Sequence, residues 1–531
     1  MSMLNEGRPT KQDDNIVVPD QNALKTHTGN RALMVDEPLI FEIGSPDRSG
    51  VDLPEAPAVA SRLGGLERGE AIGIPGLSES ETVRHYTRLS RQNYAIDVGL
   101  FPLGSCTMKH NPRLNEKIAR LKGFSDIHPL QPVDSVQGAL ELIYQLAEWL
   151  KALTGMPAVA MSPKAGAHGE LCGILAIRSA LEARGDAREV ILVPESAHGT
   201  NPATAAFAGY KVEDIPANAA GRVDLDALKA RLGPDVAGVM ITNPNTCGLF
   251  EPDMKAISEA VHAAGGLVYC DGANFNAIVG RVRPGDLGID AMHINLHKTF
   301  STPHGGGGPG SGPVVFSEAL APFAPLPFVE KTQENGPNPH FHLVEEETAE
   351  EHHGNSFGRM VAFHGQMGMF TRALTYILSH GADGLKQVAE DAVLNANYVL
   401  RSLEDVLDAP FAKSGPCMHE ALFSDSRFTN GLTTLDLAKG LIDEGYHPMT
   451  MYFPLVVHGA MLVEPTETES KAAIDQFIGA MRSVAERANA GDELLKTAPH
   501  FAPRRRLDET QAARKPILVW QEPEEYAEAA E

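Results

Sequence analysis

Cysteine and positive charge are both scarce in this chain. Only 5 of its 531 residues are cysteines, and none stands at the CxxC spacing that is typical of a metal site. Their scatter and odd number favour free thiols in a reducing compartment over a disulfide framework. Lys and Arg total 45 against 69 Asp and Glu, which gives a formal net charge of -24. Such a charge repels phosphates, so we expect no nucleic-acid partner.

Long apolar runs are absent as well. No basic segment followed by an apolar run opens the chain, and no stretch is apolar enough to span a bilayer. We therefore expect a cytoplasmic protein without a membrane partner. At 531 residues the chain is too long for one compact core. Its 50 Gly and 37 Pro favour a loop-rich α/β protein over a helical bundle.

The hydrophobic pattern changes along the chain and divides it. Between about residues 155 and 320, short apolar runs alternate with helical segments, which indicates a mainly parallel sheet with crossover helices. The runs are 189–193, 236–241, 266–270 and 292–296, with amphipathic helices predicted over 253–264 and, ahead of the sheet, 136–153. Beyond the sheet, residues 321–360 are Pro-rich and then acidic, which suggests a long connecting segment, and helices are predicted near 385–403 and over about 470–488. The predicted domains are an extended N-terminal arm (1–80), a large α/β domain (81–330), a connecting segment with a small α+β domain (331–500) and a C-terminal tail (501–531).

An acidic residue and a lysine follow two of these apolar runs. Asp271 ends the run that begins at Leu267, and Lys298 follows the run that ends at Leu296. Ligands of parallel sheets bind at the carboxyl ends of the strands. A pyridoxal-phosphate (PLP) enzyme of fold-type I needs both residue types there: a carboxylate that keeps the pyridine nitrogen protonated and a lysine that forms the internal aldimine. Either residue alone is more typical of a helix cap or a surface charge.

Three further segments supply groups that such a cofactor needs. Ala165, Gly166, Ala167 and His168 open a predicted helix ahead of the first predicted strand of the sheet, and the free N–H groups of this helix can bind a phosphate. His198 follows the run 189–193 and can stack on the pyridine ring; the alternative is an ordinary loop histidine. Asn243 and Thr246 follow the run 236–241, where they can bond the phenolic oxygen of the cofactor.

Two glycine-containing loops need separate interpretation. The run 304–310 contains GxGxxG, but it leads into a strand-like segment, whereas a dinucleotide-binding loop must open a helix. We expect instead that the glycines of this run allow its own backbone to lie close to the cofactor or to a neighbouring chain. The small hydroxyl residues of the loop 101–109 suit substrate binding, but taken alone this loop is better explained as an ordinary turn. The Arg504–Arg506 cluster is either a docking patch or, as we prefer, a solvated basic turn.

The motifs together resemble the glycine decarboxylase P-protein of the glycine cleavage system, in particular subunit 2 of its two-subunit form. The resemblance covers nearly the whole chain, and its most specific string is HKTFSTPHGGGGPG (297–310). The other strings are LGSCTMKHNP (103–112), GAHGE (166–170), HGTNPA (198–203), ITNPNTCGLFE (241–251), DGANFNA (271–277) and EPTETESK (464–471). At 165–168 the chain has AGAH, where Ser-Gly-Ala-Gln is common in that family.

This resemblance implies an activity and a set of partners. The activity is decarboxylation of glycine, with release of CO₂ and transfer of the aminomethyl group to the lipoamide of H-protein. It implies that Lys298 carries PLP, that Asp271 holds the pyridine nitrogen protonated and that His198 stacks on the ring. It also implies a heterotetramer with two copies of subunit 1, and no metal.

Two other interpretations stay open at this point. One is a self-sufficient fold-type I enzyme, such as an amino-acid decarboxylase or a cysteine desulfurase. A desulfurase needs a mobile nucleophilic cysteine, for which Cys247 and Cys270 are poorly placed. The other is a non-catalytic scaffold, which has no need of Lys298 and Asp271 together.

Overall fold

The computed structural model describes residues 35, 37–55, 57–70, 72–304, 310–332, 340–346, 355–502 and 504–520. Two compact units divide the chain: one comprises Ile96–Lys496, and the other comprises Met1–Ala95 with Thr497–Glu531. None of the described helices is long and apolar enough to cross a membrane.

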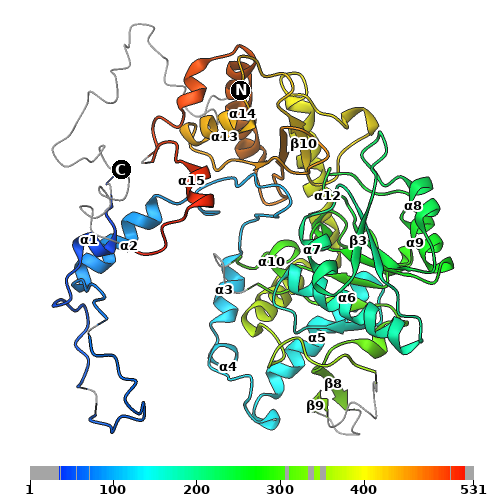
Figure 1. The fold of residues 1–531 in the computed structure, drawn as a ribbon, viewed down its shortest axis with the longest axis horizontal. Helices are drawn as coiled ribbons and strands as arrows, with labels where there is room; N and C mark the ends of the chain where they lie inside the picture. Colours follow the sequence, from blue (N-terminus) through cyan, green and yellow to red (C-terminus); the bar gives the residue numbers. More distant parts are fainter. Residues whose placement is uncertain are drawn as a thin grey trace. The chain divides into compact units, whose positions relative to one another are not determined.

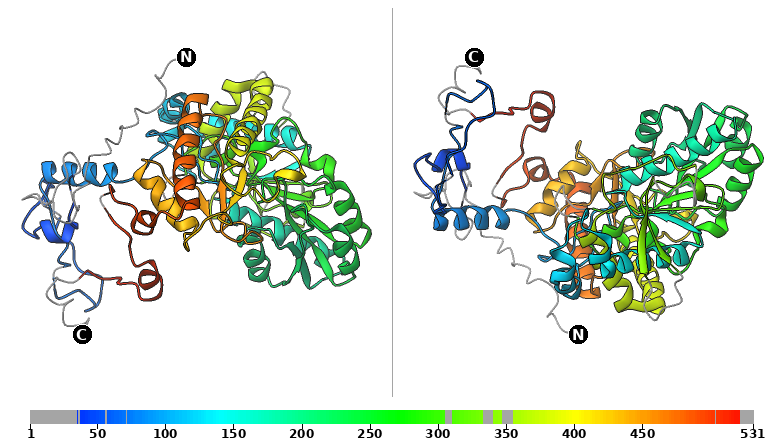
Figure 2. Two further views of the ribbon diagram at one scale, coloured as in Figure 1. Left: turned by 90° about the horizontal axis from the view of Figure 1, so that it is seen from above. Right: turned by 90° about the horizontal axis from the view of Figure 1, so that it is seen from below.

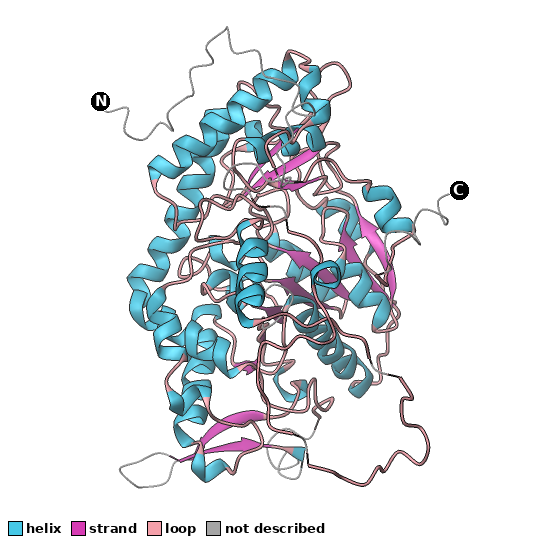
Figure 3. Cartoon of the chain, turned by 90° about the vertical axis from the view of Figure 1, so that its left-hand side faces the viewer, coloured by secondary structure: helices cyan, strands magenta, loops and turns pink. Residues whose placement is uncertain are grey.

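A central sheet forms the core of the Ile96–Lys496 unit (Figures 1 and 3). Among the described residues it has seven strands in the order β1-β7-β6-β5-β4-β2-β3. The strands are β1 (Ala158–Ala160), β2 (Val190–Pro194), β3 (Lys211–Ile215), β4 (Val236–Thr242), β5 (Leu267–Asp271), β6 (Ala291–His293) and β7 (Val314–Phe316). β7 is antiparallel to both of its neighbours, while β6, β5, β4, β2 and β3 pair in parallel.

Helices cover both faces of this sheet, which explains why its central strands β2, β4 and β5 are continuously buried, whereas the edge strand β3 is mixed (Figures 1 and 2). In β4, Val239 and Ile241 belong to one apolar cluster, and Met240 between them belongs to the other. α6 (Gly166–Ala183) and α7 (Thr200–Phe207) cover one face. The other face packs against α5 (Gln137–Thr154), α8 (Leu225–Arg231), α9 (Met254–Ala263) and the first half of α12 (Met367–Leu403).

A smaller α+β region follows in the same unit. Its sheet is antiparallel, in the order β10-β12-β11, with β10 (Ala421–Ser424), β11 (Thr450–Met451) and β12 (Ala460–Val463). The second half of α12, α13 (Thr434–Asp443) and α14 (Lys471–Asn489) pack on it through a separate apolar cluster. α12 is interrupted at Gly381, whose φ of 63° lies outside the helical range.

Shorter elements complete the described chain. In the Ile96–Lys496 unit these are α3 (Arg113–Ala119), α4 (Lys122–Ser125), α10 (Leu296–Thr299) and the hairpin of β8 (Phe328–Thr332) and β9 (His340–Val344). Short 3-10 helices are η1 (Val133–Ser135), η2 (Phe275–Ala277), η3 (Pro284–Leu287), η4 (Ala321–Phe323), η5 (Ala412–Ser414) and η6 (Glu493–Thr497). The other unit contains α1 (Ile40–Ile43), α2 (Glu79–Arg91) and α15 (Glu509–Arg514).

The elements expected from periodicity are confirmed, with four corrections. The apolar run 292–296 is not one strand, because β6 ends at His293 and the chain turns into α10 at Leu296. The helix expected near 385–403 begins at Met367, and the connecting segment near 321–360 contains the β8–β9 hairpin. β1 precedes the 165–168 loop, which was expected to lie before the first strand of the sheet. The domain boundaries stay a prediction.

Close packing of α6 on the sheet depends on a glycine. A Cβ atom at Gly173 would lie 2.5 Å from the ring of Tyr269, which is fully buried on β5. We therefore expect Gly173→Ala to lower the free energy of unfolding by about 1–3 kcal/mol, because a buried ring surrounded by backbone has no room to shift.

Gly479 offers a matched control, since it lies on an exposed part of α14 with nothing within 4 Å of an added Cβ. Gly479→Ala should stabilise the protein by up to about 1 kcal/mol through helix propensity. Chemical denaturation of both variants gives the comparison; a Gly173→Ala protein as stable as wild type would contradict the packing argument.

Candidate active site

Asp271 occupies the last position of β5 and is held by a network of polar groups. Its carboxylate accepts hydrogen bonds from Asn201 Nδ2 (3.0 Å) and from the backbone N–H of Ala273 (2.9 Å). His293 Nε2 lies 3.4 Å from Asp271 Oδ1. Burial alone would raise the pKa of Asp271, but His293, these hydrogen bonds and the charge of Lys298 together lower it. Asp271 is therefore ionised although it is buried.

Lys298 lies in α10, a single helical turn that follows β6 at the same edge of the sheet. Its Nζ is half-buried and donates a hydrogen bond to the backbone carbonyl of Ser105 (2.8 Å). The expected strand-end position is thus corrected to a helical turn beyond the strand. The lysine remains close enough for its charge to act on Asp271.

The N-terminus of α6 opens at the same edge. Ala165 is the residue before the first turn, no side chain caps it, and Gly166, Ala167 and His168 form that turn. A Cβ on Gly166 would lie 2.8 Å from Asn295 Nδ2, so the start of α6 approaches the segment between β6 and Lys298 closely. The orphan N–H groups of this helix start can bind an anion.

The end of the glycine-rich run packs against the same loop. A Cβ on Gly312 would lie 2.3 Å from the carbonyl oxygen of Ala165, and one on Gly310 would lie 3.1 Å from that of Lys164. Such a close backbone approach is possible only because these residues have no side chain. Residues 305–309 of the run lie outside the described residues.

His198 follows β2, is exposed, and is oriented by its neighbours. Its Nδ1 lies 2.9 Å from the hydroxyl of Thr200, which donates to Glu170 Oε1 (2.8 Å). The imidazole ring meets the ring of Phe453 edge-on, with 5.5 Å between centroids. An exposed ring held in this way can form a face of a binding site.

Asn243 and Thr246 differ in what they can still bind. Thr246 Oγ1 donates to the carbonyl of Ser196, so its proton is already used. Asn243 Oδ1 accepts from the backbone of Glu251, whereas its Nδ2 is buried and has no hydrogen-bond partner among the described residues. Asn243 therefore offers a free donor next to Thr242, which pairs with Asp271 in the sheet.

Sequence reasoning missed several side chains at this edge. His293, Asn201 and Glu170 all contact Asp271 or lie close enough to interact with its charge. Asn201 lies in the HGTNPA motif after β2, and Glu170 lies in the GAHGE motif after β1. Both therefore belong to segments that also supply predicted site residues. The loop 101–109, for which an ordinary turn was the preferred interpretation, contacts Lys298 through Ser105, and Cys106 Sγ lies 3.5 Å from His304 Nδ1.

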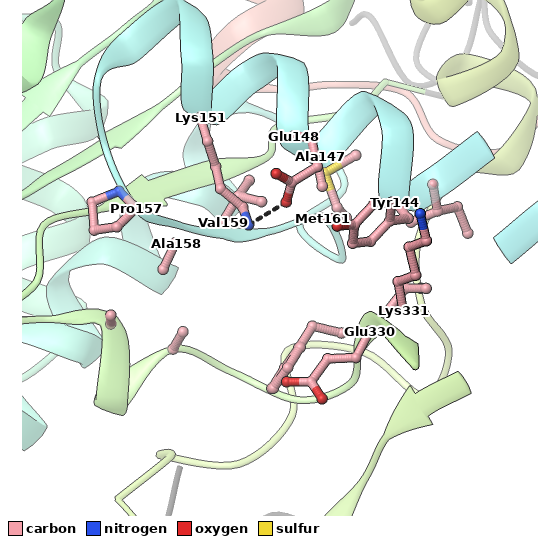
Figure 4. A pocket seen from close by; sticks show the side chains of 15 residues that line it. Tyr144, Ala147, Glu148, Lys151, Pro157, Ala158, Val159, Met161, Glu330 and Lys331 are labelled. Atoms are coloured by element: carbon pink, nitrogen blue, oxygen red, sulfur yellow. Dashed lines mark hydrogen bonds and ion pairs between the residues drawn. The ribbon is translucent and has the colours of Figure 1, made fainter. Parts of the chain in front are cut away.

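The cavity in Figure 4 is a separate feature. It has a volume of about 350 Å³ and is lined by residues of α5, β1 and β8, among them Lys151, Glu148, Glu330 and Lys331. The dashed line in the figure is the Lys151–Glu148 ion pair, whose Nζ–Oε1 distance is 2.5 Å. No predicted site residue lines it, so it does not bear on the chemistry at Lys298.

The sequence is similar to that of named proteins over almost its whole length. It is 65% identical over 522 residues, 98% of each chain, to a probable glycine dehydrogenase (decarboxylating) subunit 2 of Caulobacter vibrioides. It is 49% identical to the protein of the same name from Desulforamulus reducens, over 91% of this chain and 99% of the relative. Residues 388–500 match the family described as glycine dehydrogenase, C-terminal domain, and residues 171–308 match class-V aminotransferases.

Solved structures share the fold. A crystal structure of glycine decarboxylase (P-protein) of the glycine cleavage system superposes with a TM-score of 0.66 at 21% identity, covering 79% of this chain and 92% of that one. The glutamate decarboxylase of Lactobacillus brevis superposes with a TM-score of 0.57 at 13% identity, covering 83% and 96%.

The fold and the class-V aminotransferase match define a PLP enzyme of fold-type I. Within that class, the extent and identity of the sequence matches are decisive. The chain belongs to the family of glycine dehydrogenase (decarboxylating) subunit 2.

The donors at the carboxyl edge of the sheet fit this cofactor. An ionised buried carboxylate, a lysine amine, an uncapped helix N-terminus and the unpartnered amide of Asn243 each match one polar group of PLP. The residue assignments themselves stay a prediction.

Asp271→Asn tests this fit. The substitution keeps the shape but removes the charge, so it should weaken retention of PLP by at least about a hundredfold, because loss of a buried charge partner costs several kcal/mol. Dialysis followed by measurement of the visible absorbance of the bound cofactor gives the result.

Asp290→Asn is the matched control. Asp290 is equally buried, but it accepts from the backbone of Val268 near the start of β5, at the other end of the strand. This variant should lose stability without losing cofactor. Equal retention by the Asp271→Asn and wild-type proteins would exclude Asp271 as the partner of the pyridine nitrogen.

Proposed function

We propose that this chain catalyses the PLP-dependent decarboxylation of glycine and transfers the aminomethyl group to the lipoamide of H-protein, with release of CO₂. Membership of the glycine dehydrogenase subunit 2 family supports the substrate. The single geometric observation that carries the proposal is the ionised, buried Asp271 at the same sheet edge as the half-buried amine of Lys298.

Each residue has one task in this proposal. Lys298 binds the cofactor covalently, and Asp271 keeps the pyridine nitrogen protonated. The N–H groups of Gly166, Ala167 and His168 bind the phosphate, and His198 covers one face of the ring. When bound, the cofactor withdraws electrons from the α-carbon of glycine, so that the bond to the carboxylate can break.

The supporting residues act through position. Asn201 and His293 orient the Asp271 carboxylate, and Asn243 Nδ2 is available to donate to the phenolic oxygen. Thr246 was also predicted to contact that oxygen, but its hydroxyl proton is used by Ser196, so in our proposal it only shapes the loop.

The burial of the thiols weighs against the desulfurase alternative. Burial raises the pKa of Cys247 and of Cys270 to about 12, so neither is a thiolate at neutral pH.

Lys298→Ala should abolish the visible absorbance of the lysine-bound cofactor and reduce glycine-dependent CO₂ exchange below about one thousandth of wild type, since the covalent attachment is lost. Lys211→Ala, which removes an exposed lysine at the start of β3, serves as the control and should retain both. A Lys298→Ala protein that exchanges CO₂ at the wild-type rate would exclude the assignment.

We also propose that the chain acts with a first subunit, as two copies of each, and docks lipoylated H-protein. The names of the relatives specify a subunit 2. The 37–98 region supports a partner, because its large apolar side chains are unusually exposed: Leu53 (79%), Val59 (86%), Leu66 (85%) and Ile74 (69%). A segment that exposes several large apolar side chains is expected to bury them against a partner.

Leu53→Glu combined with Leu66→Glu should weaken binding of the first subunit by at least about tenfold, because each would place a charge in an apolar contact. Cofactor absorbance should not change. Leu130→Glu, at an equally exposed leucine (76%), is the control. Sedimentation of the mixed subunits measures the affinity; unchanged assembly of the double variant would remove this region from the interface.

A further inference from the structure

Two glutamates of the smaller α+β region are brought together by the register of β10 with β12. Glu420 directly precedes β10, and Glu464 directly follows β12. β10 and β12 are antiparallel, with Ala421 opposite Val463. One step further along each strand, Glu420 and Glu464 therefore stand opposite one another, where like charges destabilise a sheet.

The loop that contacts Lys298 borders this pair. Leu103 bridges to Val463, and the backbone N–H of Glu464 donates to Pro102 O (3.3 Å). These contacts bring Ser105 alongside Glu420, whose carboxylate accepts from the Ser105 N–H, while the Ser105 carbonyl accepts from Lys298 Nζ (2.8 Å). One peptide segment thus separates the lysine from the two carboxyls.

Both carboxyls are fully buried and incompletely satisfied. Glu420, Glu464 and the adjacent His419 each have 0% exposure. Glu420 Oε2, both oxygens of Glu464 and both ring nitrogens of His419 have no hydrogen-bond partner among the described residues. Buried polar atoms left in this state cost free energy, and most buried groups of folded proteins avoid it.

The surroundings of Glu420 and Glu464 favour a state in which one of the two carboxyls is ionised and the other is protonated. Burial raises the pKa of Glu420 to about 7, and burial together with the neighbouring Glu420 charge raises the pKa of Glu464 well above its usual range. The charge of Lys298 lowers the pKa of both glutamates, and the charge of Glu467 raises that of Glu464. Cys106 lies near the same charges: besides burial, which raises the pKa of its thiol, Lys298 lowers that pKa, while Glu420 and Glu464 raise it. Burial lowers the pKa of His419 to about 3, so His419 is neutral and supplies no positive charge.

A metal ion would be the other occupant of such a cluster. One ring nitrogen of His419 and one oxygen of each glutamate lie within 4.8 Å of one another. The Lys298 charge argues against a divalent cation, because the two would repel one another in the same buried space. A proton satisfies the pair without that cost.

We propose that Glu420 and Glu464 share one proton, and that Glu464 donates it to the sulfur that leaves when the lipoyl disulfide is opened. This role rests on the proposed function. The C–C bond of glycine breaks, CO₂ leaves, and the carbon that keeps the electron pair attacks one sulfur. The S–S bond breaks, and the second sulfur takes the bonding pair and the proton from Glu464.

The step balances in atoms and electrons. Glycine loses two electrons, the disulfide gains two, and one proton is consumed, so the products are CO₂, an aminomethyl thioether of the lipoyl arm and a free thiol. Lys298, which glycine has displaced and left as an ammonium, offsets the extra negative charge on the two glutamates. Solvent then returns the proton before the next turnover.

The shared proton is testable without turnover. In the complete complex with cofactor and first subunit, infrared difference spectra in H₂O and D₂O should show the carbonyl stretch of an un-ionised buried carboxyl. Glu464→Gln and Glu420→Gln should each remove the same component of this band, whereas any component from Glu170, whose pKa burial also raises, should remain. Asp425→Asn should keep the component that the two glutamine variants lose, since Asp425 is a carboxyl at the opposite end of β10 that accepts from the Thr434 N–H (3.0 Å).

The donor role is tested by kinetics. Transfer to lipoylated H-protein by Glu464→Gln should fall by about 10²–10⁴-fold with the KM for glycine within about twofold of wild type. The donor must be protonated, so the wild-type rate should fall as pH rises through the pKa of the pair. The variant should lack this decline.

Three results would overturn the proposal. One is a carboxyl band that neither Glu464→Gln nor Glu420→Gln changes, and another is a Glu464→Gln enzyme with the wild-type rate and pH profile. The third is a stoichiometric metal, found by elemental analysis and lost in Glu464→Gln. If the wild-type complex shows the carboxyl signal but releases no CO₂ from glycine, the proposed function and the donor role fail together, whereas the shared proton holds.

Discussion

The parallel pairing of β2, β4, β5 and β6 is the constraint on which the site depends. Strands that run in one direction end at one edge, so residues far apart in sequence meet there. His198 follows β2, Asn243 follows β4, Asp271 ends β5 and Lys298 follows β6. None of these positions requires a specific long-range contact between the side chains themselves. The sheet and its two helical layers hold them, and the chemistry is left to the loops and to one helix N-terminus.

In the smaller α+β region, antiparallel strand register also brings together side chains that are far apart in the sequence. This register places two carboxyls opposite one another, and the segment 102–107 runs beside β12 and fixes the distance to Lys298. A sheet selected for stability alone would not bury two like charges in this way. The free energy needed to bury them comes from the apolar cluster of α12, α13 and α14 that surrounds β10 and β12. Such a conflict between local stability and global position is typical of a functional site.

The sequence was sufficient for the parts of the fold that depend on local pattern. The continuous apolar runs predicted β2, β4 and β5, and helical spacing predicted α5, α9 and α14. Prediction of a strand over 292–296 was wrong at its end, because the apolar Leu296 is buried in α10 and not in β6. The residues Asp271 and Lys298 could be found because each follows its own strand. Glu420 and Glu464 could not, since their meeting depends on the register of β10 with β12, and nothing local to either residue encodes it. His293 was hidden for a related reason: it lies inside the apolar run 292–296, and only the pairing of β6 with β5 brings it to Asp271.

The two carboxyl pairs at the site share one electrostatic logic. Burial and the charge of Asp271 raise the pKa of Glu170, while His293, Ala273 and Asn201 outweigh burial and lower that of Asp271. On the small-domain side, Glu420 and Glu464 repel in the same way, and Lys298 is a cation that faces them. When neighbouring acids are pushed apart in pKa, one becomes a fixed charge and the other a proton carrier. Asp271 is the fixed charge at the end of β5. Lys298 interacts with Asp271 and with the Glu420–Glu464 pair. When the charge of Lys298 changes during a reaction, the proton of the Glu420–Glu464 pair can be gained or lost, so that the net charge around the lysine stays balanced.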